Sequence, residues 1–206
     1  LARLIALLHD IGRFEQLKRY DSFEPGTMDH AAYGVKVLFD EGMIRRFLPD
    51  DKWDSIIYTA IAHHSDYELP EISDPQTLLH AKLIRDEDKL DNCRVKLVDS
   101  TSTFINVSEE ELGTQNITQK VYETVFKNKC ILSADRVTQM DYWVSYIVYF
   151  FDINFKESFD IIAENDYLNR IIDRIPYSNP VTKEQMENIR VYMQNFINSH
   201  TNSQSF

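Results

Sequence analysis

The chain has 206 residues, of which 43% are hydrophobic and 27% are charged, with only 5 glycines and 6 prolines. This composition can bury a sizeable core and is typical of one compact, helix-rich domain. The formal net charge of -11 argues against a general surface for nucleic-acid polymers or anionic membranes, because their phosphates would be repelled. Cys93 and Cys130 form no disulfide framework and no metal or redox motif, so we expect a reducing, cytoplasmic setting and no thiol nucleophile.

Residues 1–12 predict a helix that carries an adjacent histidine and aspartate near its end. Its apolar residues recur at helical spacing, namely Leu4, Leu7, Leu8 and Ile11. Gly12 stands where a helix is expected to end, which places His9 and Asp10 in the last turn. Neighbouring residues of a helix point about 100° apart, so both side chains can reach one metal only where the helix geometry relaxes.

Two further predicted helices bring more histidines. His30 begins one of them, with Thr27 or Asp29 as the expected N-cap. The other leads to His63 and His64 before Pro70, and its apolar residues are Trp53, Ile56, Ile57, Ala60 and Ile61. His64 continues the face that Ile57 and Ala60 begin, so we expect it to point inward.

The segment from Thr77 to Asn92 predicts a fourth helix with two neighbouring stripes. One stripe holds the leucines Leu79, Leu83 and Leu90, and the adjacent one holds Ile84, Asp88 and Asp91. Asp88 is therefore expected to border the core rather than open water. Imidazole and carboxylate groups without thiolate favour manganese, iron, nickel, cobalt, zinc or magnesium, so the sequence predicts a divalent metal site assembled from several helices.

The second half of the chain is predicted to form further helices. Residues 100–116 are polar and predict a surface connection, and helices are expected over residues 118–128, 133–151 and 156–175. A last helix after Pro180 has Met186, Ile189, Met193 and Phe196 on one face, which we expect to pack on the chain's own core. The apolar run from Tyr142 to Phe151 is too short to cross a bilayer and predicts a buried helix. No alternation typical of strands is present, so we predict an all-α protein.

The runs LLHDIGRF, AIAHHS and LIRDEDKLDN, in this order, resemble the HD superfamily of metal-dependent phosphohydrolases, named for its His-Asp doublet. The resemblance covers about residues 1–95 and implies a helical HD bundle. With it we predict a single domain over residues 1–206, made of the HD core, which lacks the family's first helix in this chain, and a helical C-terminal extension over about 117–199.

The family pattern implies a metal site with one or two ions. His9, Asp10 and Asp88 would hold one ion, while His30 and a histidine of the pair His63 and His64 would hold a second, with Asp10 bridging. His64 is preferred to His63.

The chain departs from the family pattern in two places. The pattern has a further histidine ligand upstream of the doublet, whereas Leu1 already lies in the doublet's helix. We expect that ligand on residues upstream; without it the site would be incomplete, which would favour a binding role. The second departure follows His64, where Ser65, Asp66 and Tyr67 stand in place of the GYP signature of cyclic dinucleotide phosphodiesterases. This counts against cyclic di-GMP as a substrate.

The resemblance implies hydrolysis by a metal-activated water that attacks a small phosphorylated substrate, most readily a nucleotide. Asp10 would orient this water, and Arg13 and Lys89 would hold the phosphate, as Arg85 also could. Two alternatives stay open, a di-iron HD-type oxygenase and a non-catalytic sensor that binds a nucleotide or a metal. We predict no nucleic-acid polymer and no membrane as partners, while a homo-oligomer is compatible with the sequence.

Three other polar residues have sequence-level interpretations. Asp91 would hold a histidine ligand by its ring N-H, and His80 is expected to be structural. Asp152 lies among aromatic residues, where a carboxylate is costly to bury without a partner, so it is expected to cap a helix or face the site.

Overall fold

The computed structural model describes residues 1–23 and 26–201. It is 68% helical, and the part of the chain it describes contains no strand, which confirms the all-α prediction. The chain forms two compact units, Leu1–Asp88 and Lys89–Phe206. The boundary falls inside one long helix rather than in the polar stretch over residues 100–116, and the single domain predicted for residues 1–206 stays a prediction.

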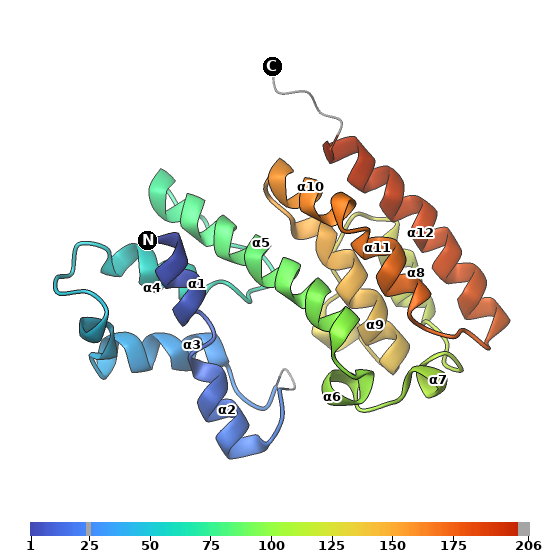
Figure 1. Cartoon of the computed structure of the whole chain (residues 1–206), viewed down its shortest axis with the longest axis horizontal. Coiled ribbons are helices and arrows are strands. Elements are labelled where there is room, and N and C mark those ends of the chain that lie inside the picture. The colour runs from blue at the N-terminus through green and yellow to red at the C-terminus, as the bar shows by residue number, and fades with distance from the viewer. Residues whose placement is uncertain (24–25, 202–206) are drawn as a thin grey trace. The chain divides into compact units, whose positions relative to one another are not determined.

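Unit 1 is built from short helices and the first part of a long one (Figure 1). Its elements are α1 (Ala2–Leu8), α2 (Gly12–Tyr20), α3 (His30–Val35), the π-helix η1 (Lys36–Asp40), the 3-10 helix η2 (Met43–Arg46), α4 (Asp54–Ala62) and the start of α5 (Pro75–Val98). α3 packs against α2 and α4, and α1 packs on α4. Their shared core consists of Ile5, Leu8, Val35, Leu38, Ile44, Ile56, Ile57, Ala60, Ile61 and Ile84.

The sequence predicted that Gly12 ends the first helix. In the structure, Gly12 begins the next helix instead. α1 stops at Leu8, and α2 starts at Gly12 after a tight turn in which the Ile11 amide donates to the Leu8 carbonyl at 3.1 Å. A Cβ atom at residue 12 would lie 2.0 Å from the carbonyl oxygen of His30. A glycine is required here because the start of α2 touches the backbone of α3. The sequence alone does not distinguish a glycine needed for this close approach from a glycine that ends a helix.

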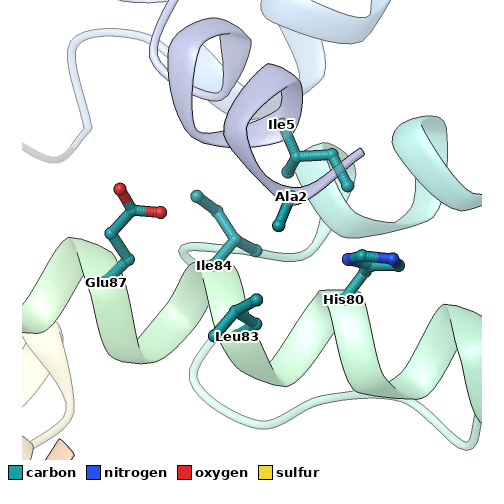
Figure 2. A pocket seen from close by; sticks show the side chains of 6 residues that line it. All are labelled: Ala2, Ile5, His80, Leu83, Ile84 and Glu87. Carbon is teal, nitrogen blue, oxygen red and sulfur yellow. The ribbon is translucent and has the colours of Figure 1, made fainter.

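The leucines at the start of α5 predicted which face of this helix is buried, but a different face points into the core. Leu79 and Leu83 are exposed, whereas Ala81, Ile84 and Arg85 are buried. Figure 2 shows Ile84 and Leu83 of α5 facing Ala2 and Ile5 of α1 across a crevice too narrow to admit water. His80 lies in this crevice, in agreement with a structural role.

Unit 2 comprises the remainder of α5 and the helices that follow (Figure 1). These are α6 (Thr101–Ile105), α7 (Glu109–Leu112), α8 (Gln119–Val125), η3 (Ser133–Asp135), α9 (Gln139–Val148), η4 (Tyr149–Asp152), α10 (Lys156–Glu164), α11 (Tyr167–Asp173) and α12 (Pro180–Thr201). α10 and α11 pack on α12, and α8 packs on α9. Trp143 and Phe150 are fully buried in its core, as is the face of α12 formed by Met186, Ile189 and Met193.

Three predictions for unit 2 were wrong. The helix predicted over residues 133–151 is divided into η3, α9 and η4, and α9 begins only at Gln139. The polar stretch over residues 100–116 is not a simple surface loop, because it contains α6 and α7 and buries Ile105 and Leu112. The helix predicted over residues 156–175 is divided by Asp166, whose φ of 51° lies in the left-handed region. Aspartate is among the few residues that tolerate this conformation, and the chain turns there between α10 and α11.

Cys93 belongs to the unit 2 core, where burial raises the pKa of its thiol to about 12. The thiol is therefore protonated at neutral pH, in agreement with the prediction that it is no nucleophile. None of the described helices has the length and apolar character that crossing a membrane requires.

Candidate metal centre

Asp10 lies at the centre of the histidine cluster because the chain turns sharply between α1 and α2. His9 is the C-cap of α1 and Ile11 is the N-cap of α2, so Asp10 lies in the turn between the two helices. Its oxygen atoms face two groups of histidines. Oδ1 lies 3.3 Å from Nε2 of His30 and 3.5 Å from Nε2 of His64, while Oδ2 lies 3.7 Å from Nε2 of His9.

The remaining predicted ligands come from three other elements of unit 1. His30 is the first residue of α3, where the Asp29 side chain caps the helix by accepting from the Ala32 amide at 2.9 Å. His64 follows the end of α4 and is buried, and its Nε2 lies 3.1 Å from Nε2 of His30. Asp88 of α5 has an oxygen 3.9 Å from Nε2 of His9.

Backbone carbonyls fix which ring nitrogen of His9 and His64 faces the cluster. His9 Nδ1 donates to the Ala6 carbonyl at 2.8 Å, and His64 Nδ1 donates to the Ile61 carbonyl at 2.7 Å. A carbonyl oxygen can only accept, so Nδ1 carries the proton in both rings and the neutral ring presents a bare Nε2 lone pair. This orientation by a second hydrogen bond is the one that histidine ligands of metals commonly show.

The donor set fits a divalent cation. Oδ1 of Asp10 is buried and makes no hydrogen bond with any described residue, a costly state that a bound cation would relieve. One ligand atom each from His9, Asp10 and His64 lies within 4.8 Å of the others. Ligands about 2.1 Å from one ion lie roughly 3–4 Å apart, and the separations of 3.1 to 3.9 Å within the cluster match this spacing.

Burial and neighbouring charges shift the pKa values of His9, Asp10 and His30. Burial lowers the pKa of His9, but the carboxylates of Asp88 and Asp10 outweigh it and raise that pKa to about 9. Burial raises the pKa of Asp10, yet the ring nitrogens of His30 and His64 and the charge of His9 hold it well below its ordinary value. The pKa of His30 is lowered, mainly by burial, which keeps this ring in the neutral form that binds metals.

Arg13 lies beside this cluster and is itself held in place. Its Nε is 3.4 Å from Oδ1 of Asp10, and its Nη1 donates to Oε1 of Gln16 at 2.9 Å. Gln16 is fully buried and donates from Nε2 to the Thr27 hydroxyl at 2.8 Å. Gln16 could not be predicted as part of the site, because a glutamine on a helix is ordinarily a solvated residue.

Other predicted residues have partners elsewhere. His63 is half-exposed, and its Nδ1 lies 2.6 Å from Oδ2 of Asp66. Lys89 forms an ion pair with Asp152 at 2.7 Å. Lys89 is thus a partner for the Asp152 carboxylate. A phosphate that bound Lys89 would have to displace this carboxylate. Their roles in metal and phosphate binding stay predictions.

The described contacts of Asp91 lead to Arg94 and not to a histidine. The Asp91 carboxylate is exposed and accepts from Nε of Arg94 at 2.7 Å, an ordinary pair on a helix surface.

Comparison with known protein families bears on the first half of the chain. The family model of the HD domain matches residues 1–93. This match supports assigning residues 1–93 to the HD superfamily. No curated protein and no solved structure gave a significant match. HD domains form a superfamily of metal-dependent phosphohydrolases and bind divalent metals, and unit 1 holds a His/Asp cluster suited to such an ion. The matched residues agree with the 1–95 extent predicted from the three motifs.

Proposed function

We propose that the protein is a metal-dependent phosphohydrolase that acts on a small phosphoester, with a nucleotide as the favoured substrate class. The observation that carries this proposal is the buried Oδ1 of Asp10, which makes no hydrogen bond with any described residue and faces the ring nitrogens of His30 and His64. The HD membership of residues 1–93 supports the same chemistry.

We propose that the site holds two ions, each with its own set of donors. His9, Asp88 and Oδ2 of Asp10 form one set of donors, and His30, His64 and Oδ1 of Asp10 form another. Asp10 would then bridge them, as the family resemblance implies. When bound, divalent ions lower the pKa of a coordinated water and neutralise charge on phosphoryl oxygens.

The chain's own residues would bind and orient the reactants. Asp10 would accept a hydrogen bond from the attacking water and fix its position. Arg13, kept beside Asp10 by Gln16, would donate two parallel hydrogen bonds to the phosphate. This local cation matters because the net charge of -11 disfavours the approach of an anionic substrate.

Phosphate release tests the proposal. The metal-reconstituted full-length protein is assayed with manganese, nickel, magnesium or iron against a panel of nucleotides and small phosphomonoesters. Asp10→Ala should abolish release and metal binding with the helical circular dichroism unchanged, because Asp10 lies in a turn outside the core. Asp51→Ala removes an exposed carboxylate of the same unit and should leave release intact.

Two results would contradict the proposal. Release that persists in Asp10→Ala would show that the cluster is not the active site. A metal-loaded protein that releases no phosphate from any substrate would favour one of the alternatives, and bound iron with oxygen uptake would then identify the di-iron oxygenase, whereas nucleotide binding without turnover would identify the sensor.

Metal stoichiometry tests the number of ions. The wild-type protein should bind two manganese ions, His30→Gln should bind one, and Asp10→Ala should bind none. Equilibrium dialysis followed by elemental analysis measures this directly. A single ion in the wild-type protein, held by His9, Asp10 and His64 as one group, would contradict the bridged arrangement.

A further inference from the structure

Arg85 is a buried cation whose described hydrogen bonds lead to the turn that carries His64. It belongs to α5, and only 2% of its surface is exposed. Its Nη1 donates to the carbonyl oxygens of His63 at 2.9 Å, His64 at 3.3 Å and Asp66 at 2.7 Å, and its Nη2 donates to that of Tyr67 at 3.5 Å. One guanidinium thus holds most of a five-residue turn.

The turn needs such a donor because it follows the end of a helix. α4 ends at Ala62, and carbonyl groups beyond a helix end lack intrahelical partners and carry partial negative charge. Arginine suits the task better than lysine, because its planar group presents several donors in fixed directions, whereas an ammonium is a compact point charge. A cation buried here also has a high cost if the turn moves away from it.

The contacts of Arg85 connect two parts of the metal centre. The His64 ring is fixed at Nδ1 by the Ile61 carbonyl, and its backbone is fixed by Arg85, so both the position and the direction of Nε2 are set. Asp88 lies three residues beyond Arg85 on the same helix, which places the two side chains on one face of α5. Arg85 therefore joins the turn that bears one ligand to the helix that bears another.

We propose that Arg85 is a positioning residue of the metal centre. It keeps His64 directed at Asp10 before any ion arrives, so that binding does not have to order the turn. The role assigned to Arg85 rests on the proposed function, but its effect on the turn can be tested in metal-free protein. This replaces the earlier expectation that Arg85 could hold a phosphate, since its guanidinium is buried and engaged with the backbone.

The first test uses metal-free protein and does not depend on activity. Arg85→Lys keeps the positive charge but loses the planar group with its several donors. Arg85→Met keeps the approximate volume without a buried charge. At least one of the two variants should therefore fold. Hydrogen exchange of the amides in residues 63–67 should become at least tenfold faster in each, with the body of α4 still protected. Nitrogen NMR of the imidazoles should show that His64 loses its fixed Nδ1-H tautomer.

The second test measures manganese affinity by equilibrium dialysis. Loss of a residue that orients a ligand typically weakens metal binding by about 10- to 100-fold, and we expect this loss in both Arg85 variants. Arg45→Lys is the matched control, because Arg45 is a surface guanidinium of unit 1 that pairs with Asp54 and the Asp50 carbonyl. Its manganese affinity should equal that of the wild-type protein.

The outcomes separate this inference from the proposed function. A lower melting temperature with unchanged exchange, tautomer and manganese affinity would show that Arg85 only stabilises the fold, and would overturn the inference. A wild-type protein that binds manganese but releases no phosphate would contradict the hydrolase and leave the affinity comparison valid. A wild-type protein that binds no metal would overturn both, even if the exchange result showed that Arg85 orders the turn.

Discussion

His9 meets opposite requirements in the metal-free and the metal-loaded protein. Without metal, the carboxylates of Asp88 and Asp10 raise the pKa of its imidazole to about 9, so the ring is protonated at neutral pH and forms favourable charge pairs. A metal ligand must be neutral, so an ion that binds His9 has to displace this proton. The same two carboxylates that hold the proton would compensate the charge of the ion.

The raised pKa of His9 predicts how the stability of the metal-free protein depends on pH. The folded-state pKa of about 9 lies above the ordinary value of 6.5, so the stabilisation from protonated His9 is complete below pH 6.5 and is lost as the pH rises through 9. Urea unfolding of metal-free protein at pH 6, 7.5 and 9.5 should show this decline. His9→Gln should not show that part of the decline, and equal slopes in both proteins would rule out His9 as its source.

Metal affinity should have the opposite dependence. Because manganese competes with the proton on His9, its affinity for the wild-type protein should rise as the pH increases toward 9, as measured by competition with a chelator of known pH dependence. An affinity that is flat between pH 7 and 9 would indicate that His9 is not a ligand.

Arg13 can be tested separately from the ligands. A hydrogen bond to a charged group contributes about 1.5–3 kcal/mol, which corresponds to roughly a 10- to 100-fold effect on rate or binding. Arg13→Ala should therefore lower kcat/KM for phosphate release by about this factor while the manganese stoichiometry stays unchanged. Loss of an ion in this variant would mean that Arg13 supports the metal centre rather than the substrate.

At the scale of elements, the helices were largely predictable, and the contacts between them were not. The cap of α3, the end of α4 near His63 and the buried run in α9 follow from local signals, because caps and apolar periodicity are properties of a few adjacent residues. Of the ligands that the three motifs predict, His9, Asp10 and His64 come within 4.8 Å of one another, and the ligand set as a whole stays a prediction. The roles of Gln16 and Arg85 could not be predicted, since each depends on a partner from a different element.

The contact between α2 and α3 provides a test at this scale. Gly12→Ala would place a Cβ 2.0 Å from a backbone carbonyl that cannot move without shifting His30, so it should destabilise the protein by roughly 3 kcal/mol or more and weaken metal binding. Gly34→Ala is the matched control, because its nearest new contact is a side-chain atom at 3.4 Å and alanine favours a helix. Chemical denaturation should give a change within about 1 kcal/mol for Gly34→Ala.

At the scale of the whole molecule, metal binding should appear as added stability. A ligand that binds only the folded state at one hundred times its dissociation constant adds about 2.7 kcal/mol. Manganese should therefore raise the melting temperature of the wild-type protein, and a chelator should reverse the effect. Asp10→Ala should not respond to either addition. Equal responses of the two proteins would place the stabilising metal elsewhere.

The buried thiol of Cys93 gives unit 2 a built-in reporter of its own opening. With a pKa of about 12 and a place in the core, this thiol is neither charged nor accessible while unit 2 stays closed. An alkylating reagent applied in short pulses would modify it only in molecules whose core has opened, whereas the partly exposed Cys130 records access from the surface. The ratio of label on the two sulfur atoms then measures how often unit 2 opens, and no probe has to be introduced.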